Sequence, residues 1–188
     1  MILERTPLAG LLVVRPEKQA DARGFFARLW CETEFAAAGV SFRPQQISVS
    51  FNAASRTLRG LHWQEHPHGE TKLVRASSGR IYDVAVDLRP GSATRCRWFG
   101  IELDSQRHIA LLIPAGFAHG FITLTDNAEV TYAIDTPFVP AAARGARYDD
   151  PAFGITWPLM PTVMSDRDRI WPDFPARSAV PREMPAAP

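Results

Sequence analysis

The stretch Ile81-Tyr82-Asp83-Val84-Ala85-Val86-Asp87-Leu88 decides the fold class, because its apolar side chains recur at every second position. This period of two is typical of a β-strand, in which successive side chains point to opposite faces. One face of the stretch is apolar, whereas the other carries Asp83 and Asp87 and lines either solvent or a cavity. We expect a structural role for both aspartates.

Short runs of the same kind lie on either side of this stretch, separated by clusters of glycine, proline, asparagine and aspartate. They predict strands at residues 8–14, 47–51, 57–64, 72–76, 81–88, 96–103, 109–113, 120–123 and 129–135. Short strands with turn signals between them predict a sandwich or barrel and not a βαβ fold. Helix-forming residues at 32–38 end at Gly39, which predicts one short helix. After residue 137 we expect an irregular segment packed on the barrel, with a polar turn at 165–168.

Length and composition limit the classes of protein to which this chain can belong. Its 188 residues suffice for one domain, which we expect over residues 1–175, before a flexible tail at 176–188. The formal net charge of +1 is spread along the chain, so no basic face for nucleic acid is expected. Cys31 and Cys96 form no C-x-x-C pair, and neither a signal peptide nor a membrane-spanning run is expected. We therefore expect a cytoplasmic protein without a membrane partner.

The run Leu58-Arg59-Gly60-Leu61-His62-Trp63-Gln64 brings a histidine and an arginine into one predicted strand, with Lys72 soon after. Strand alternation would place His62 on the face opposite Arg59. A histidine that points into a pocket can abstract a proton near neutral pH. The alternative is a buried histidine that is satisfied by a backbone carbonyl. On a later strand, Tyr132 is either a core residue or, across a cavity, the acid that complements His62.

Further histidines raise the alternative of a metal centre. His119 ends the run Pro114-Ala115-Gly116-Phe117-Ala118-His119, which resembles the second half-motif of the cupins, small double-stranded β-helix barrels. His66 and His68 fit the first half-motif, but Lys72 occupies its glutamate position, and an ammonium repels a cation. We therefore predict an all-β cupin or jelly-roll barrel with one or two short helices and without a metal.

The order and spacing of the motifs resemble those of the dTDP-4-dehydrorhamnose 3,5-epimerases, nucleotide-sugar epimerases of cupin fold. The resemblance extends from about residue 8 to residue 174. It rests on Asp21-x-Arg23-Gly24-Phe25-Phe26, Leu58-Arg59-Gly60-Leu61-His62, Lys72-Leu73-Val74, Asp83-Val84, Val86-Asp87-Leu88-Arg89, Ile113-Pro114-x-Gly116-Phe117-Ala118-His119-Gly120-Phe121, Tyr132, Asp150-Pro151, Ile155-x-Trp157-Pro158 and Ser165-x-x-Asp168.

The resemblance implies an isomerase that inverts C3 and C5 of a nucleotide-linked 4-keto-6-deoxyhexose, with dTDP as the expected nucleotide, in deoxysugar biosynthesis of the dTDP-L-rhamnose type. His62 would abstract the proton, with Asp168 orienting the imidazole and stabilising its charged form. Lys72 would stabilise the enolate oxygen at C4, and Tyr132 would return a proton from the opposite face. No cofactor is implied, because the ketone itself accepts the electron pair.

The resemblance also implies a set of substrate-binding residues. They are Arg23, Phe26, Gln46, Ser48, Arg59, His119, Phe138 and Arg167. Among them, Arg59 and His119 would help Lys72 at the enolate, and Arg23 would reach the diphosphate in the neighbouring subunit of a homodimer. Four positions depart from the family's usual pattern, mostly on the nucleotide and sugar-stacking side: Arg28, Ser48, Phe138 and Ala143.

Three alternatives stand beside this interpretation. An epimerase acting at C3 only, or a 3,4-ketoisomerase, would use the same histidine base. A metal-dependent cupin enzyme such as a dioxygenase would use His66, His68 and His119. A non-catalytic sugar-binding cupin would need neither His62 nor Tyr132.

Overall fold

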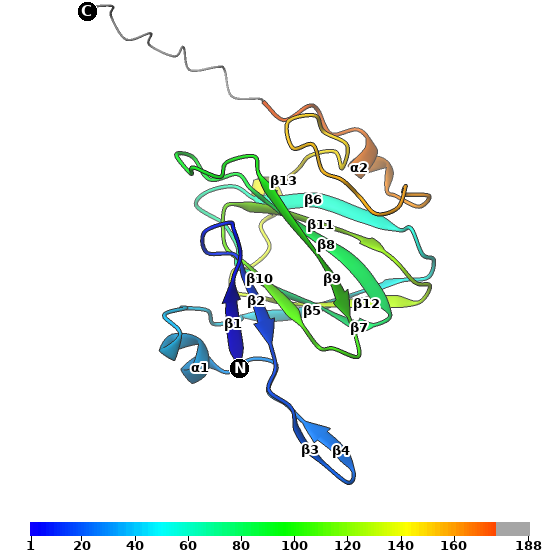
Figure 1. The fold of residues 1–188 in the computed structure, drawn as a ribbon. Coiled ribbons are helices and arrows are strands. Elements are labelled where there is room, and N and C mark those ends of the chain that lie inside the picture. Colours follow the sequence, from blue (N-terminus) through cyan, green and yellow to red (C-terminus); the bar gives the residue numbers. More distant parts are fainter. Residues whose placement is uncertain (176–188) are drawn as a thin grey trace, which may run out of the picture.

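Two antiparallel β-sheets face each other and enclose the core (Figure 1). The six-stranded sheet has the order β1 (Ile2–Arg5), β2 (Leu12–Arg15), β10 (Ala110–Ile113), β7 (Lys72–Ser78), β12 (Ala128–Ile134) and β5 (Gln46–Asn52). The five-stranded sheet has the order β13 (Ala143–Gly145), β6 (Leu58–Gln64), β11 (Phe117–Thr123), β8 (Arg80–Asp87) and β9 (Trp98–Asp104). A separate hairpin and three short helices complete the fold: β3 (Gln19–Asp21), β4 (Gly24–Phe26), α1 (Glu32–Ala37), a 3-10 helix (Pro140–Ala142) and α2 (Asp166–Arg169).

This computed structural model describes residues 1–175, so the flexible tail predicted at 176–188 lies outside the described residues. All pairings between the named strands are antiparallel. The two-sheet arrangement with short helices confirms the predicted all-β jelly-roll fold class. Over residues 1–175, no helix is long and apolar enough to cross a membrane.

The N-terminal strand prediction is partly wrong. Residues 8–14 do not form one strand, because a turn around Gly10 joins β1 to β2 as a hairpin. The Thr6 hydroxyl lies 3.0 Å from the Leu11 carbonyl oxygen and stabilises this turn, while Gly10 supplies a φ of +86°. An apolar composition alone did not distinguish this turn at residues 7–10, of which only Leu8 is buried, from a strand.

Both faces of β8 are buried, which the alternation in the sequence did not reveal. Ile81 and Ala85 face the opposite sheet and belong to the core cluster between the sheets. Val84 and Val86 face outward and pack in a second cluster with the C-terminal segment, residues 146–174. The apolar face of this strand is therefore the outer one, and Asp83 points into the interior.

The C-terminal segment, orange in Figure 1, runs over the β6 side of the five-stranded sheet and places α2 there. Ser165 caps this helix, since its side chain accepts a hydrogen bond from the backbone N–H of Asp168. The indole of Trp171 lies so close to Gly145 that a Cβ there would fall 2.3 Å from ring atoms. This contact anchors the segment to β13. The region predicted as an irregular segment with a polar turn thus also contains a short strand and a helical turn.

Candidate active site

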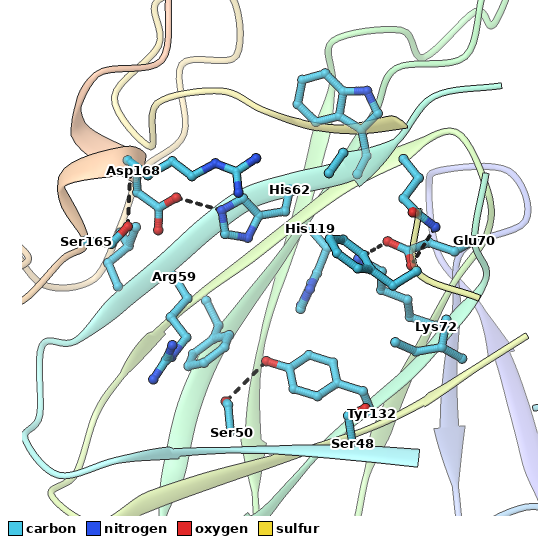
Figure 2. A pocket seen from close by; sticks show the side chains of 18 of the residues that line it. Ser48, Ser50, Arg59, His62, Glu70, Lys72, His119, Tyr132, Ser165 and Asp168 are labelled. Carbon is cyan, nitrogen blue, oxygen red and sulfur yellow. Dashed lines mark hydrogen bonds and ion pairs between the residues drawn. The ribbon is translucent and has the colours of Figure 1, made fainter. Parts of the chain in front are cut away.

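A cavity of about 820 Å³ lies between the two sheets (Figure 2). Side chains from β5, β6, β7, β11 and β12 line it, together with the segments 138–144 and 163–168. The wall therefore combines one end of the barrel with part of the C-terminal segment. Residues that are separated by a hundred positions in the sequence meet here.

Strand β6 carries one residue more than its partner β11 in the cavity wall. His62 pairs with His119 and Arg59 pairs with Phe121, so three steps along β6 match two steps along β11. A bulge of this kind brings residues i and i+3 to the same face. Arg59 and His62 therefore both line the cavity, and the prediction that they lie on opposite faces is wrong.

Gly60 makes this bulge possible. Its φ of +116° is rarely adopted by residues with a side chain, and an added Cβ would lie 2.6 Å from the Cα of Gly120. The next residue, Leu61, turns outward into the apolar cluster with Val84. His62 consequently faces the cavity.

His62 forms a hydrogen-bonded pair with Asp168, whose side chain is buried. The imidazole Nε2 lies 2.6 Å from the Asp168 Oδ1. Burial alone would raise the pKa of Asp168, but hydrogen bonds from His62, Gly60 and Ser165 outweigh it and lower that pKa. Because a carboxylate only accepts, Nε2 carries the proton and Nδ1 keeps a lone pair in the neutral ring. This is the arrangement of a general base held by a carboxylate.

A second imidazole–carboxylate pair lies on the neighbouring strands. His119 Nε2 is 2.7 Å from Asp83 Oδ1, and both side chains are buried. The second oxygen of Asp83, Oδ2, has no hydrogen-bond partner among the described residues. Asp83, for which a structural role was expected, therefore orients His119, a histidine that lines the cavity.

Tyr132, on β12, lies on the wall opposite β6 (Figure 2). Its ring meets that of His119 edge-on, with centroids 6.0 Å apart, and its hydroxyl lies 3.4 Å from Ser50 Oγ. Burial raises the pKa of Tyr132 well above the usual value for a phenol. The hydroxyl thus stays protonated at neutral pH and can act as a proton donor.

Lys72, at the start of β7, lines the same cavity. Its ammonium lies 2.7 Å from the Glu70 Oε1, and both side chains are largely buried. Sequence reasoning missed Glu70. Glu70 precedes Lys72 by two residues, and in an extended segment side chains two residues apart point to the same face.

Comparison with known proteins identifies the family. The family model for dTDP-4-dehydrorhamnose 3,5-epimerase matches residues 5–176. The chain belongs to the dTDP-4-dehydrorhamnose 3,5-epimerase family.

Several characterised members of this epimerase family resemble the chain over nearly its whole length. It is 39% identical to the dTDP-4-dehydrorhamnose 3,5-epimerase of Sinorhizobium fredii over 175 residues, 93% of this chain and 90% of that protein. The crystal structure of the Bacillus anthracis epimerase with TDP and PPi bound has a TM-score of 0.89 at 36% identity, covering 92% of this chain and 99% of that one. A 3'-monoepimerase from Streptomyces bikiniensis in complex with dTDP-quinovose has a TM-score of 0.82 at 32% identity, covering 89% of this chain and 85% of that one. These findings confirm the predicted family, its cupin fold and its isomerase class.

Six of the eight binding residues implied by the epimerase resemblance line the cavity: Gln46, Ser48, Arg59, His119, Phe138 and Arg167. Ala143, which departs from the family pattern, lines it too. Phe121 and Ser165, which belong to the motifs of the family resemblance, also line the cavity, and sequence reasoning missed further lining residues: Ser50, Arg144 and Met164. These side chains have no common spacing in the sequence, so only the fold brings them together.

Arg23 and Phe26 are not in the cavity of their own chain. They lie on the β3–β4 hairpin, which projects away from the barrel (Figure 1). The Arg23 side chain is 90% exposed and Phe26 is 65% exposed. Arg28, another departure from the epimerase pattern, is also exposed and pairs with Glu34.

The ligand set of the metal alternative is not brought together. His66 and His68 are exposed and do not line the cavity. Among residues 1–175, no group of three or more histidine, cysteine, aspartate or glutamate side chains could hold a metal ion. The cavity residues of this epimerase family member are instead suited to proton transfer.

Proposed function

We propose that this chain epimerises C3 and C5 of a nucleotide-linked 4-keto-6-deoxyhexose, with dTDP as the nucleotide, on the route to dTDP-L-rhamnose. The observation that carries this proposal is the His62–Asp168 pair on one wall of the cavity, with Tyr132 on the other and Lys72 among the lining residues. The TDP-bound Bacillus anthracis relative supports the nucleotide.

The first step is proton abstraction by His62. Asp168 accepts from Nε2–H, so the free Nδ1 of the neutral ring takes the proton from the carbon next to the C4 ketone. The electron pair of the broken C–H bond moves to form a C=C bond, and the carbonyl electrons move to the C4 oxygen. The resulting imidazolium is stabilised by the buried Asp168 carboxylate.

The negative charge on the enolate oxygen needs fixed countercharges. Lys72 and Arg59 line the cavity and are the cationic side chains that would supply these countercharges. His119 would join them as an imidazolium, because Asp83 accepts from Nε2 and only the charged ring has a second N–H to donate. Positioned donors in a site that excludes water stabilise a developing negative charge more strongly than the same groups do in bulk solvent. No cofactor is needed, because the ketone is the electron acceptor.

Inversion follows when the proton returns from the other face. Tyr132 lies across the cavity from β6, and its raised pKa keeps the phenol protonated until the carbanion forms. Donation from Tyr132 to carbon leaves a phenolate, which regains its proton from solvent as His62 releases its own.

Proton exchange tests the proposal. The enzyme is incubated with dTDP-4-keto-6-deoxyglucose in heavy water, and C3 and C5 are followed by NMR. Deuterium at both carbons is the expected result. Activity that is lost with a chelator and regained with iron would contradict this mechanism.

A second candidate function is epimerisation at C3 only. It is favoured by the similarity to the Streptomyces bikiniensis 3'-monoepimerase. In the same NMR experiment, deuterium at C3 alone would reject double epimerisation, and an inverted configuration at C3 in that product would establish this function.

We further propose a cytoplasmic homodimer. Edge strand β5 exposes a row of apolar side chains, Ile47 (74%), Val49 (59%) and Phe51 (57%), which a second copy could cover. The hairpin that carries Arg23 extends beyond its own barrel and supports delivery of this arginine to a partner's cavity. The two free cysteines fit a reducing compartment.

A further inference from the structure

Lysine is rare in this chain, which makes the lysine in the cavity conspicuous. Of 21 basic residues, only Lys18 and Lys72 are lysines and all others are arginines. Lys18 lies on the outside, where its ammonium sits over the ring of Phe25. The Lys72 side chain is 12% exposed, and its charge is paired with a Glu70 side chain that is 9% exposed. The cavity thus contains a buried ion pair, and the proposed mechanism gives a role to Lys72 but none to Glu70.

Glu70 is held at both of its oxygens. Oε1 lies 2.7 Å from the Lys72 ammonium, and Oε2 accepts from the Gln64 amide nitrogen at 3.3 Å. The Gln64 NH₂ group also lies 3.1 Å from the His68 carbonyl and 3.2 Å from the Pro137 carbonyl, so its two hydrogens are shared among three acceptors. The Gln64 oxygen accepts from the Val139 backbone N–H at 2.6 Å. This chain of bonds connects Lys72 to β6 and to the segment that carries the cavity residue Phe138.

The chemistry of this position requires an acid. A carboxylate accepts at both oxygens, so it can serve the Lys72 ammonium and the Gln64 amide together. A glutamine would offer one acceptor and one donor, and its NH₂ group would then face either the ammonium or the Gln64 NH₂ group. An ammonium on a four-carbon stem has many rotamers, and a partner fixed elsewhere limits them.

We propose that Glu70 is a positioning residue, which holds the Lys72 ammonium where the enolate oxygen forms. This inference rests on the proposed function of Lys72 and goes beyond it, because it assigns the placement of the catalytic charge to a neighbouring acid. Loss of the Glu70 charge is expected to affect the transition state more than substrate binding, since the enolate charge exists only after proton abstraction.

The first experiment observes Lys72 directly and needs no substrate. Protein labelled with ¹³C-lysine gives signals from two lysines only, and Lys18→Arg assigns them. In the wild type, the two Hε protons of Lys72 are expected to be inequivalent because the ammonium is held in one position. In Glu70→Gln they should merge, as those of a mobile side chain do. Merged Hε signals in the wild type, or unchanged separation in Glu70→Gln, would overturn the proposal.

The second experiment measures turnover. Glu70→Gln should lower kcat about tenfold while KM changes less than about twofold. In a Lys72→Met background the same substitution should change the residual kcat less than about twofold, because the group that Glu70 positions is gone. The control is Glu102→Gln, which removes the acid of an exposed ion pair with Arg80 and should leave kcat unchanged.

The outcomes separate the two proposals. An unchanged or higher kcat in Glu70→Gln, or an equal loss in the Lys72→Met background, overturns the positioning role. Full activity of Lys72→Met alone contradicts the enolate role in the proposed function, while the lysine NMR still decides whether Glu70 holds the ammonium.

Discussion

The two ring nitrogens of His62 have different tasks. Nε2 donates to Asp168 at 2.6 Å, which leaves Nδ1 as the nitrogen that can accept a proton from carbon. The carboxylate therefore determines which tautomer the enzyme presents to its substrate.

Replacing this carboxylate by its amide tests the tautomer. Asp168→Asn would donate from its NH₂ group to Nε2 and place the proton on Nδ1, where it blocks abstraction. We expect kcat to fall about a thousandfold or more, as for other histidine bases that lose their orienting acid. The measurement is steady-state turnover, with Asp166→Asn on the exposed side of the same helical turn as control. Activity within about tenfold of wild type would contradict the role of Asp168.

Tyr132→Phe should separate proton exchange from inversion. The variant keeps His62 and therefore should still exchange the substrate hydrogens with heavy water. It lacks the hydroxyl that delivers a proton from the opposite face, so formation of the inverted product should fall about a hundredfold. NMR of the sugar ring measures both rates in one sample. Equal losses of exchange and inversion would argue against Tyr132 as the acid.

At the scale of elements, the loop after β8 depends on one buried carboxylate. Burial alone would raise the pKa of Asp87, but hydrogen bonds from Arg89, Ser92 and Thr94 hold it well below its usual range. A folded-state pKa below the unfolded value means that this stabilisation is present above about pH 4 and is lost as the pH falls.

Asp87→Asn is therefore expected to lower the free energy of unfolding by about 2 kcal/mol at neutral pH. The difference between wild type and variant should narrow below about pH 4, because the unfolded wild-type chain then gains a proton at this carboxyl while the folded chain still holds it ionised. Urea unfolding at several pH values measures this difference in the free energy of unfolding. Asp149→Asn, at an exposed ion pair with Arg147, is the control and should show little change. A difference that does not vary with pH would contradict the assignment.

The elements that were predicted correctly carry local signals. The alternation in β8 and the glycine after α1 lie within a few residues of the features they predict. The bulge in β6 has only a weak local signal, the glycine at position 60, because its register is set by the pairing with β11. The burial of Glu70 likewise results from the closure of the barrel. The position of His62 in a pocket could be predicted from the sequence, whereas the side of the strand occupied by Arg59 could not.

At the scale of the whole molecule, the position of Arg23 predicts sites that are shared between subunits. Light scattering should give the mass of a dimer, and a monomer would refute the proposal. His62→Ala and Arg23→Ala should each lose activity, the latter by about a hundredfold in kcat/KM because a charged partner of the diphosphate is removed.

Mixing these two inactive variants tests the sharing directly. In a two-fold symmetric heterodimer, one site combines the intact His62 of one chain with the intact Arg23 of the other. After random subunit exchange, about a quarter of all sites are complete, so about a quarter of wild-type activity should return. A mixture of His62→Ala with Asp168→Asn is the control and should stay inactive, since both residues belong to one chain's cavity. No recovery in the first mixture would show that Arg23 acts within its own subunit or not at all.

The extra residue of β6 has a consequence for the evolution of the enzyme. Deleting Gly60, which carries no side chain, would let β6 pair regularly with β11. The deletion would, however, turn Arg59 away from the cavity and leave His62 without its neighbouring cation. Selection for activity therefore acts on the length of this strand as well as on its residues. Among active descendants, deletions at Gly60 or Leu61 should be rarer than substitutions at Leu61.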